Sequence, residues 1–227
     1  MVRQAGVSRV ARVRRWVLSR SWFELTTATV LVVLLVSGLF GGLREVDTDP
    51  VVALQAGQAV SAQPLQVRVT DAYTTTSFGG IEKKGDTPQV YPDTSKRGRF
   101  IIVEAEVENT SDATVGYDVL SRAVSLADAS GFFPRAGGDA LVPADEARPY
   151  AVYTMPEKAV FGVAQPGLTY RVAYLFEQSS TTAPGARVTT VVNRHTWRED
   201  SLDFHFDWKD PEPQASGSLP LPARNAP

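Results

Sequence analysis

Potential metal ligands alternate along the segment before the C-terminal tail. Asp203, His205 and Asp207 occupy every second position, which puts their side chains on one face of a β-strand. With His195 from a neighbouring strand they could bind a divalent cation. Residues i and i+2 of a strand lie about 7 Å apart, so three of them cannot reach one ion without a bend. We therefore expect a solvated outer face and keep the metal site as the alternative; the opposite face then carries the apolar row Leu202, Phe204, Phe206 and Trp208.

Other catalytic patterns are missing from the sequence. The chain has no cysteine and only two histidines, which excludes cysteine nucleophiles, zinc-thiolate sites and disulfide scaffolds. It contains neither the G-x-S-x-G elbow of serine hydrolases nor the G-x-x-x-x-G-K-[ST] phosphate loop. Residues 1–24 hold six arginines and one glutamate, a charge of +5 in a chain of net charge −2, so the remainder carries −7. An acidic outer part disfavours binding to nucleic acid. Because the catalytic motifs are missing, we also expect no enzymatic activity, no cofactor and no identifiable small-molecule substrate.

Two long loops are the candidates for binding a partner protein. Thr74–Gly98 is longer than a hairpin needs and combines cations with an aromatic side chain, at Lys83, Lys84, Tyr91, Lys96 and Arg97. The alternative for this loop is a disordered insertion. Phe132–Pro149 is similar in character, and its Phe132 and Phe133 either fill the end of the fold or anchor a partner.

A single apolar stretch near the N-terminus predicts a membrane anchor. Leu25–Leu43 contains 19 residues without a charge, close to the length that spans a bilayer. The arginine-rich residues 1–24 precede it and would remain in the cytoplasm, so the rest of the chain would face outward across the plasma membrane. A cleaved signal peptide is the alternative, but the first small-residue site, Val60-Ser61-Ala62, comes roughly 20 residues too late.

Small residues in this stretch are spaced for contact between helices. Ser37 and Gly41, and Gly38 and Gly42, lie four positions apart, the spacing that lets a second helix approach closely. They are candidate contacts to an integral-membrane partner.

The outer part predicts an all-β fold. Along Phe100–Glu108 apolar residues alternate with glutamates, and a second strand is expected whose inward row is Tyr170, Val172, Tyr174 and Phe176. Several such runs separated by Gly and Pro turns favour an antiparallel β-sandwich over residues 64–208, with a Greek-key barrel as the alternative. Residues 44–63 have little periodicity and are expected to form a stalk. Residues 209–227 contain five prolines and are expected to be a disordered tail.

Two motifs suggest a family. Arg99–Thr110, a strand ending in Asn-Thr, and Gln165–Glu177, a Pro-Gly turn leading into a strand, resemble parts of the immunoglobulin-like extracellular domains of unknown function on Gram-positive (actinobacterial) membrane proteins and lipoproteins. Members of that family usually follow a signal peptide or a lipobox, whereas this chain has no lipobox cysteine and its apolar stretch is expected to remain as an anchor. The resemblance implies an Ig-like, envelope-facing domain and offers no catalytic residues.

These observations favour a membrane-anchored module that binds or assembles with other proteins. We expect an accessory subunit of an envelope complex, such as a transporter or a wall-assembly machine. The alternative is an extracytoplasmic sensor of a small ligand or a metal ion. The motifs select no particular partner or substrate.

Overall fold

The computed structural model describes residues 21–39, 50–79, 94–95, 97–127, 130–133, 146–183, 185–199 and 206–224. The chain forms two compact units, Met1–Thr48 and Asp49–Pro227, and each is treated by itself.

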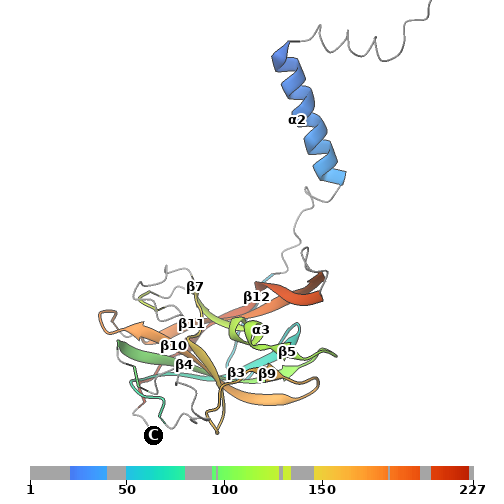
Figure 1. The fold of residues 1–227 in the computed structure, drawn as a ribbon. Helices are drawn as coiled ribbons and strands as arrows, with labels where there is room; N and C mark the ends of the chain where they lie inside the picture. The colour runs from blue at the N-terminus through green and yellow to red at the C-terminus, as the bar shows by residue number, and fades with distance from the viewer. Residues whose placement is uncertain are drawn as a thin grey trace, which may run out of the picture. The chain divides into compact units, whose positions relative to one another are not determined.

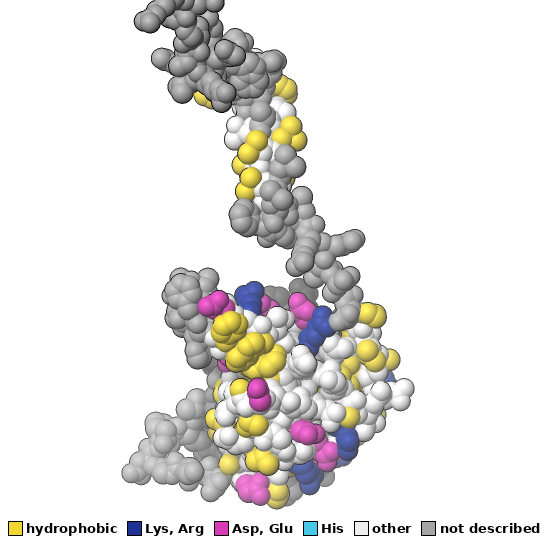
Figure 2. All heavy atoms as spheres, turned by 90° about the vertical axis from the view of Figure 1, so that its right-hand side faces the viewer, with side chains coloured by type: hydrophobic (Ala, Val, Ile, Leu, Met, Phe, Trp, Pro, Cys, Tyr) yellow, Lys and Arg dark blue, Asp and Glu magenta, His cyan; other side chains and the backbone are white. Residues whose placement is uncertain are grey.

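The first unit contains helix α2 (Trp22–Leu39). Its 18 residues correspond to about 27 Å of helix. Apolar side chains such as Val30, Leu31 and Val33 are about half exposed, and Figure 2 shows hydrophobic side chains along the helix. Among the residues that the structure describes, no helix combines the length and the hydropathy required to cross a membrane.

The second unit is a β-sandwich (Figure 1). In spatial order, its first sheet contains β1 (Val52–Ala53), β12 (Phe206–Pro220), β11 (Arg187–Glu199), β6 (Val124–Ala127) and β7 (Glu146–Ala147). The second sheet contains β2 (Ala59–Ala62), β3 (Leu65–Thr75), β4 (Gly98–Asn109), β10 (Thr169–Ser179) and β8 (Ala151–Thr154). The short strands β5 (Val115–Gly116) and β9 (Val163–Ala164) pair with each other, and a short helix, α3 (Tyr117–Arg122), follows β5. Neighbouring strands are antiparallel except β1 and β12.

The main core lies between the two sheets. On β4 the residues Ile101, Val103, Ala105 and Val107 are buried, while Glu104, Glu106 and Glu108 are only half buried. Strand β10 pairs with β4 in the register Val103↔Tyr174, which places both rows on the inner face. The alternation predicted for these two strands is therefore confirmed.

The second sheet also buries part of its outer face. Phe100 and Ile102, which point away from the main core, are fully buried and belong to a second hydrophobic cluster. The other members of this outer cluster come from β10, from β8, from Tyr150 just before β8 and from Phe78 after β3. The whole cluster is Phe78, Phe100, Ile102, Tyr150, Ala151, Tyr153, Ala173 and Leu175.

The sandwich is longer at both ends than the sequence analysis expected. β1 and β2 fall inside the expected stalk at residues 44–63, and both are hydrogen-bonded into the sheets. Much of the expected disordered tail at residues 209–227 forms β12, which pairs with β11. Beyond β12, Arg224 N donates a hydrogen bond to the Thr74 carbonyl of β3, so the chain passes from the first sheet to the second. The proline content was misleading because Pro211 and Pro213 lie where β12 has a hydrogen-bonded neighbour on one side only, and edge strands tolerate proline.

Of the predicted apolar row, Trp208 packs against the main core, whereas Phe206 does not belong to it. Phe206 is 48% exposed and Trp208 is only half buried. Instead Phe206 stacks on Trp197 of β11, with 6.1 Å between the ring centroids. Leu202 and Phe204 lie outside the described residues.

Candidate functional site

The structure describes only some of the predicted contact residues. Ser37 and Gly38 lie in α2, whereas Gly41 and Gly42 are outside the described residues. Of the two predicted binding loops, Arg97, Phe132 and Phe133 are described; those outside the description are Lys83, Lys84, Tyr91 and Lys96.

The bases of the two loops meet at one end of the sandwich. Arg97 donates hydrogen bonds from Nη2 and Nε to Glu177 Oε2, at 2.7 and 3.1 Å. Ser95 Oγ donates to the other carboxylate oxygen at 2.9 Å. The Arg97 guanidinium also lies 4.1 Å from the ring centroid of Phe133, which comes from the other loop. We call Ser95, Arg97, Phe133 and Glu177 the loop-end cluster.

Glu177 is the buried member of the loop-end cluster. Its side chain is 2% exposed, against 25% for Arg97. A buried carboxylate is costly unless it is paired and hydrogen-bonded, and here both oxygens have a donor. The backbone completes the junction, since Phe133 N donates to the Glu177 carbonyl at 3.0 Å.

The two phenylalanines of the second loop have different environments. Phe132 is 2% exposed, belongs to the main core and meets Phe176 edge to face, with 6.4 Å between centroids. Of the two alternatives for Phe132, it therefore fills the end of the sandwich and is too buried to anchor a partner. Phe133 remains half buried and covers Arg97. A partner could reach Phe133 and Arg97 but not Phe132.

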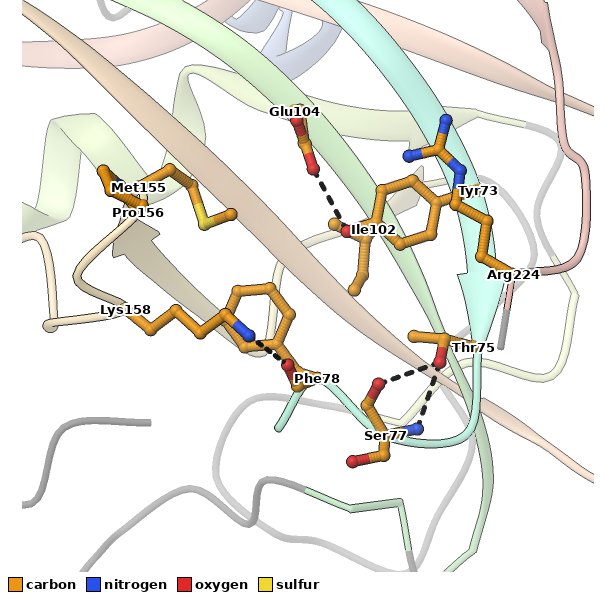
Figure 3. A pocket seen from close by; sticks show the side chains of 10 residues that line it. All are labelled: Tyr73, Thr75, Ser77, Phe78, Ile102, Glu104, Met155, Pro156, Lys158 and Arg224. Carbon is orange, nitrogen blue, oxygen red and sulfur yellow. Dashed lines mark hydrogen bonds between the residues drawn. The ribbon is translucent and has the colours of Figure 1, made fainter. Parts of the chain in front are cut away.

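A pocket of about 380 Å³ opens on the outer face of the second sheet (Figure 3). Its floor is Ile102 of β4, next to Phe78 of the outer cluster. The walls come from β3, from the turn after β8 and from the segment after β12; the lining residues are Tyr73, Thr75, Ser77, Phe78, Ile102, Glu104, Met155, Pro156, Lys158 and Arg224.

One wall of the pocket is held by a tyrosine and a glutamate. Tyr73 Oη donates a hydrogen bond to Glu104 Oε1 at 3.1 Å. Burial, followed by the nearby Glu104 carboxylate, raises the pKa of Tyr73, so the phenol stays protonated and remains a donor. Arg224 lies 4.3 Å from the centroid of the Tyr73 ring and forms an ion pair with Asp71.

A lysine lies on the other wall. Lys158 Nζ donates to the carbonyl oxygens of Phe78 and Gly79, both at 2.7 Å, and is 4.8 Å from the Phe78 ring centroid. Carbonyl groups are neutral, so these bonds position the ammonium without cancelling its charge. Within the described ranges, Lys158 has no carboxylate partner and Glu104 has no cationic partner.

The proposed metal ligands are not brought together where they are described. His195 is buried, and within the described part of the chain neither ring nitrogen has a hydrogen-bond partner. Burial, followed by the charge of Arg122, lowers the pKa of His195 to about 4. Asp207 is exposed and lies opposite Arg198 in the register of β11 and β12, and Arg198 is three positions from His195 along β11. Asp203 and His205 lie outside the description, and among the residues it covers no group of three or more His, Cys, Asp or Glu could hold a metal.

The pocket residues were not recognised from the sequence. The alternation on β4 indicated an outward Glu104, but nothing local indicated which residues would surround it. Lys158 and Arg224 lie far from β4 in sequence, and only the folded sheet brings them to the same face.

The comparisons with known proteins add little. No protein-family model and no curated protein matches this chain. One similar solved structure is an uncharacterized beta-sandwich protein from Clostridium difficile, with 8% identity and a TM-score of 0.45, covering 77% of this chain and 98% of that one.

Proposed function

We propose that this chain is a membrane-anchored, extracytoplasmic binding module. It would be an accessory subunit of an envelope complex, such as a transporter or a wall-assembly machine, with an integral-membrane protein as its partner. Its body would be an immunoglobulin-like domain of the kind carried by Gram-positive membrane proteins. The observation that carries the proposal is the loop-end cluster, because it fixes the bases of two long loops as one surface.

The anchor is supported by the apolar surface of α2. The helix exposes valine and leucine side chains over its described length, and water does not favour such a surface. Its 18 residues fall a few ångströms short of the roughly 30 Å hydrocarbon core of a bilayer. In the proposal, residues 40–43 complete the span, and the small residues from Ser37 to Gly42 contact a partner helix.

The orientation is supported by charge. Six arginines precede the apolar stretch, and basic flanks remain on the cytoplasmic side. The acidic body would therefore lie outside the membrane.

The contact surface is supported by the chemistry of the loop-end cluster. Arg97 and Phe133 are partly accessible, and arginine and aromatic residues are enriched at protein interfaces. Glu177 holds the guanidinium in place before any partner arrives, which reduces the entropy lost on binding.

Single cysteines would test the topology, because the natural chain has none. Asp112→Cys lies at an exposed position after β4, and Ser8→Cys lies in the basic arm. A membrane-impermeant maleimide should label Asp112→Cys in intact cells and Ser8→Cys only after lysis. The opposite pattern would refute the proposed orientation.

Site-specific photo-crosslinking would test the contact. A photoreactive amino acid at Phe133 should give one discrete adduct with a membrane protein in cells. The matched control is Leu168, an exposed residue beside Asn109 at the other end of β4. Equal adducts from both positions, or none from Phe133, would count against the loop end as the contact surface.

A further inference from the structure

The pocket on the outer face of the second sheet has the properties of a preformed small-molecule site. Its volume of about 380 Å³ falls within the 300–1,000 Å³ typical of ligand pockets. Ile102 and Phe78 in the floor are held by the outer cluster, and Tyr73 is held between Glu104 and Arg224. None of these residues belongs to the loop-end cluster, although Phe78 lies in the same predicted loop, Thr74–Gly98, as Arg97.

Two opposite charges face the pocket from different walls. The Glu104 side chain enters from β4, and Lys158 enters from the turn after β8 (Figure 3). Tyr73 uses one oxygen of the Glu104 carboxylate, which leaves the other oxygen as an acceptor. Lys158 uses two of its three N–H donors on backbone carbonyls, which leaves one. The third charged group of the lining, Arg224, is already paired with Asp71.

The surface between these two charges is apolar. Ile102 lies below, Met155 lies beside Pro156 on one wall, and the Phe78 ring lies under the Lys158 side chain. A ligand that covers this surface buries hydrocarbon, which is favourable in proportion to the area removed from water.

The charge arrangement restricts the class of ligand. An anion that carries no positive group would be repelled by the Glu104 carboxylate, and a cation that carries no negative group would be repelled by the Lys158 ammonium. Electrostatic complementarity therefore favours a molecule that carries both charges. We propose that this pocket binds a small zwitterion of amino-acid or short-peptide chemistry, with its ammonium at Glu104, its carboxylate at Lys158 and an apolar side chain over Ile102.

Titration calorimetry on the full chain in detergent would test the proposal with defined probes. Leucine and leucyl-leucine both carry an apolar side chain and two charged termini, and they distinguish a free amino acid from a peptide. N-acetyl-leucyl-leucine lacks the ammonium, and leucyl-leucinamide lacks the carboxylate. We expect at least one zwitterionic probe to bind and each blocked peptide to bind about tenfold or more weakly, since each loses a charge-assisted hydrogen bond.

Substitutions at Glu104 and Lys158 test which of these residues binds the ammonium of the ligand and which binds its carboxylate. Glu104→Gln should remove the preference for a free ammonium and keep the preference for a free carboxylate, and Lys158→Met should do the reverse. Glu106→Gln is the matched control, because Glu106 is the next outward glutamate on β4 and pairs with Arg68 outside this pocket.

Two outcomes would overturn the inference without relying on any variant. The first is no heat with either zwitterionic probe up to about 1 mM, where binding would be worth no more than about 4 kcal/mol. The second is equal affinity of the natural chain for the free and the blocked peptides, which would mean that the pocket recognises only apolar surface. Neither outcome bears on the membrane topology or on crosslinking at Phe133.

Discussion

The guanidinium of Arg97 lies between the ring of Phe133 and the carboxylate of Glu177. Arg97 comes from the loop before β4 and Phe133 from the loop after β6, so one side chain joins two loops that are distant in sequence. Because Glu177 sits in β10, both loops are fastened to a central strand of the second sheet. This relationship leads to the first two predictions.

Replacing Arg97 should destabilise the body. Arg97→Met leaves the buried Glu177 carboxylate without its cation, and breaking a buried pair costs about 3 kcal/mol or more. The free energy of unfolding, from urea titration of the full chain in detergent, measures the loss. Arg68→Met removes the exposed ion pair with Glu106 and should cost less than about 1 kcal/mol. Equal losses of unfolding free energy from both variants would show that the burial of Glu177 does not increase the cost of removing its ion-pair partner.

Replacing Phe132 or Phe133 by alanine should show which of the two rings packs in the main core and which lies near the surface. Phe132→Ala opens a cavity in the main core and should cost about 3 kcal/mol or more of unfolding free energy. Phe133→Ala removes a half-buried ring and should cost about 1 kcal/mol. The same urea titration compares them. A larger loss for Phe133 would contradict the assignment of Phe132 to the core.

Gly217 should not tolerate a side chain. A Cβ at this position of β12 would overlap the carbonyl of Leu54, which follows β1. Gly217→Ala should therefore lower the free energy of unfolding by about 2 kcal/mol through strain where β1 meets β12. Gly162→Ala is the control, since nothing lies within 4 Å of a Cβ placed there. Equal stability of the two variants would argue against close packing at Gly217.

His195 should make stability depend on pH. Its pKa is about 4 in the folded chain and 6.5 when unperturbed, so below pH 6.5 the unfolded state takes up the proton first. The contribution of His195 to stability is constant above pH 7 and falls between pH 6.5 and 4, by about 2–3 kcal/mol. His195→Leu should lose that part of the decline, as measured by urea titration at several pH values. Parallel curves for the natural chain and the variant would refute a buried neutral histidine.

The local pattern was sufficient for the inner rows of β4 and β10. Val103 and Glu104 point to opposite faces of β4 because successive side chains in a strand alternate, and that period can be read without knowing the neighbours. The same reasoning correctly predicted the inner row of β10.

Local rules failed where pairing partners were distant. The tail looked disordered because proline disfavours a ladder, yet β11 offers a partner along most of β12, and the stretch with Pro211 and Pro213 has no second neighbouring strand that would need its N–H groups. For His195, the sequence left a metal ligand as the alternative but could not show that the ring would be buried.

The sequence by itself determined the all-β character of the body and the apolar N-terminal helix, since both follow from periodicity within a few residues. Only the tertiary structure decided that Arg97 meets Glu177, and that Glu104 and Lys158 share a pocket. Those contacts join segments far apart in the chain, and their positions depend on the order of strands in a sheet, which short-range patterns do not encode.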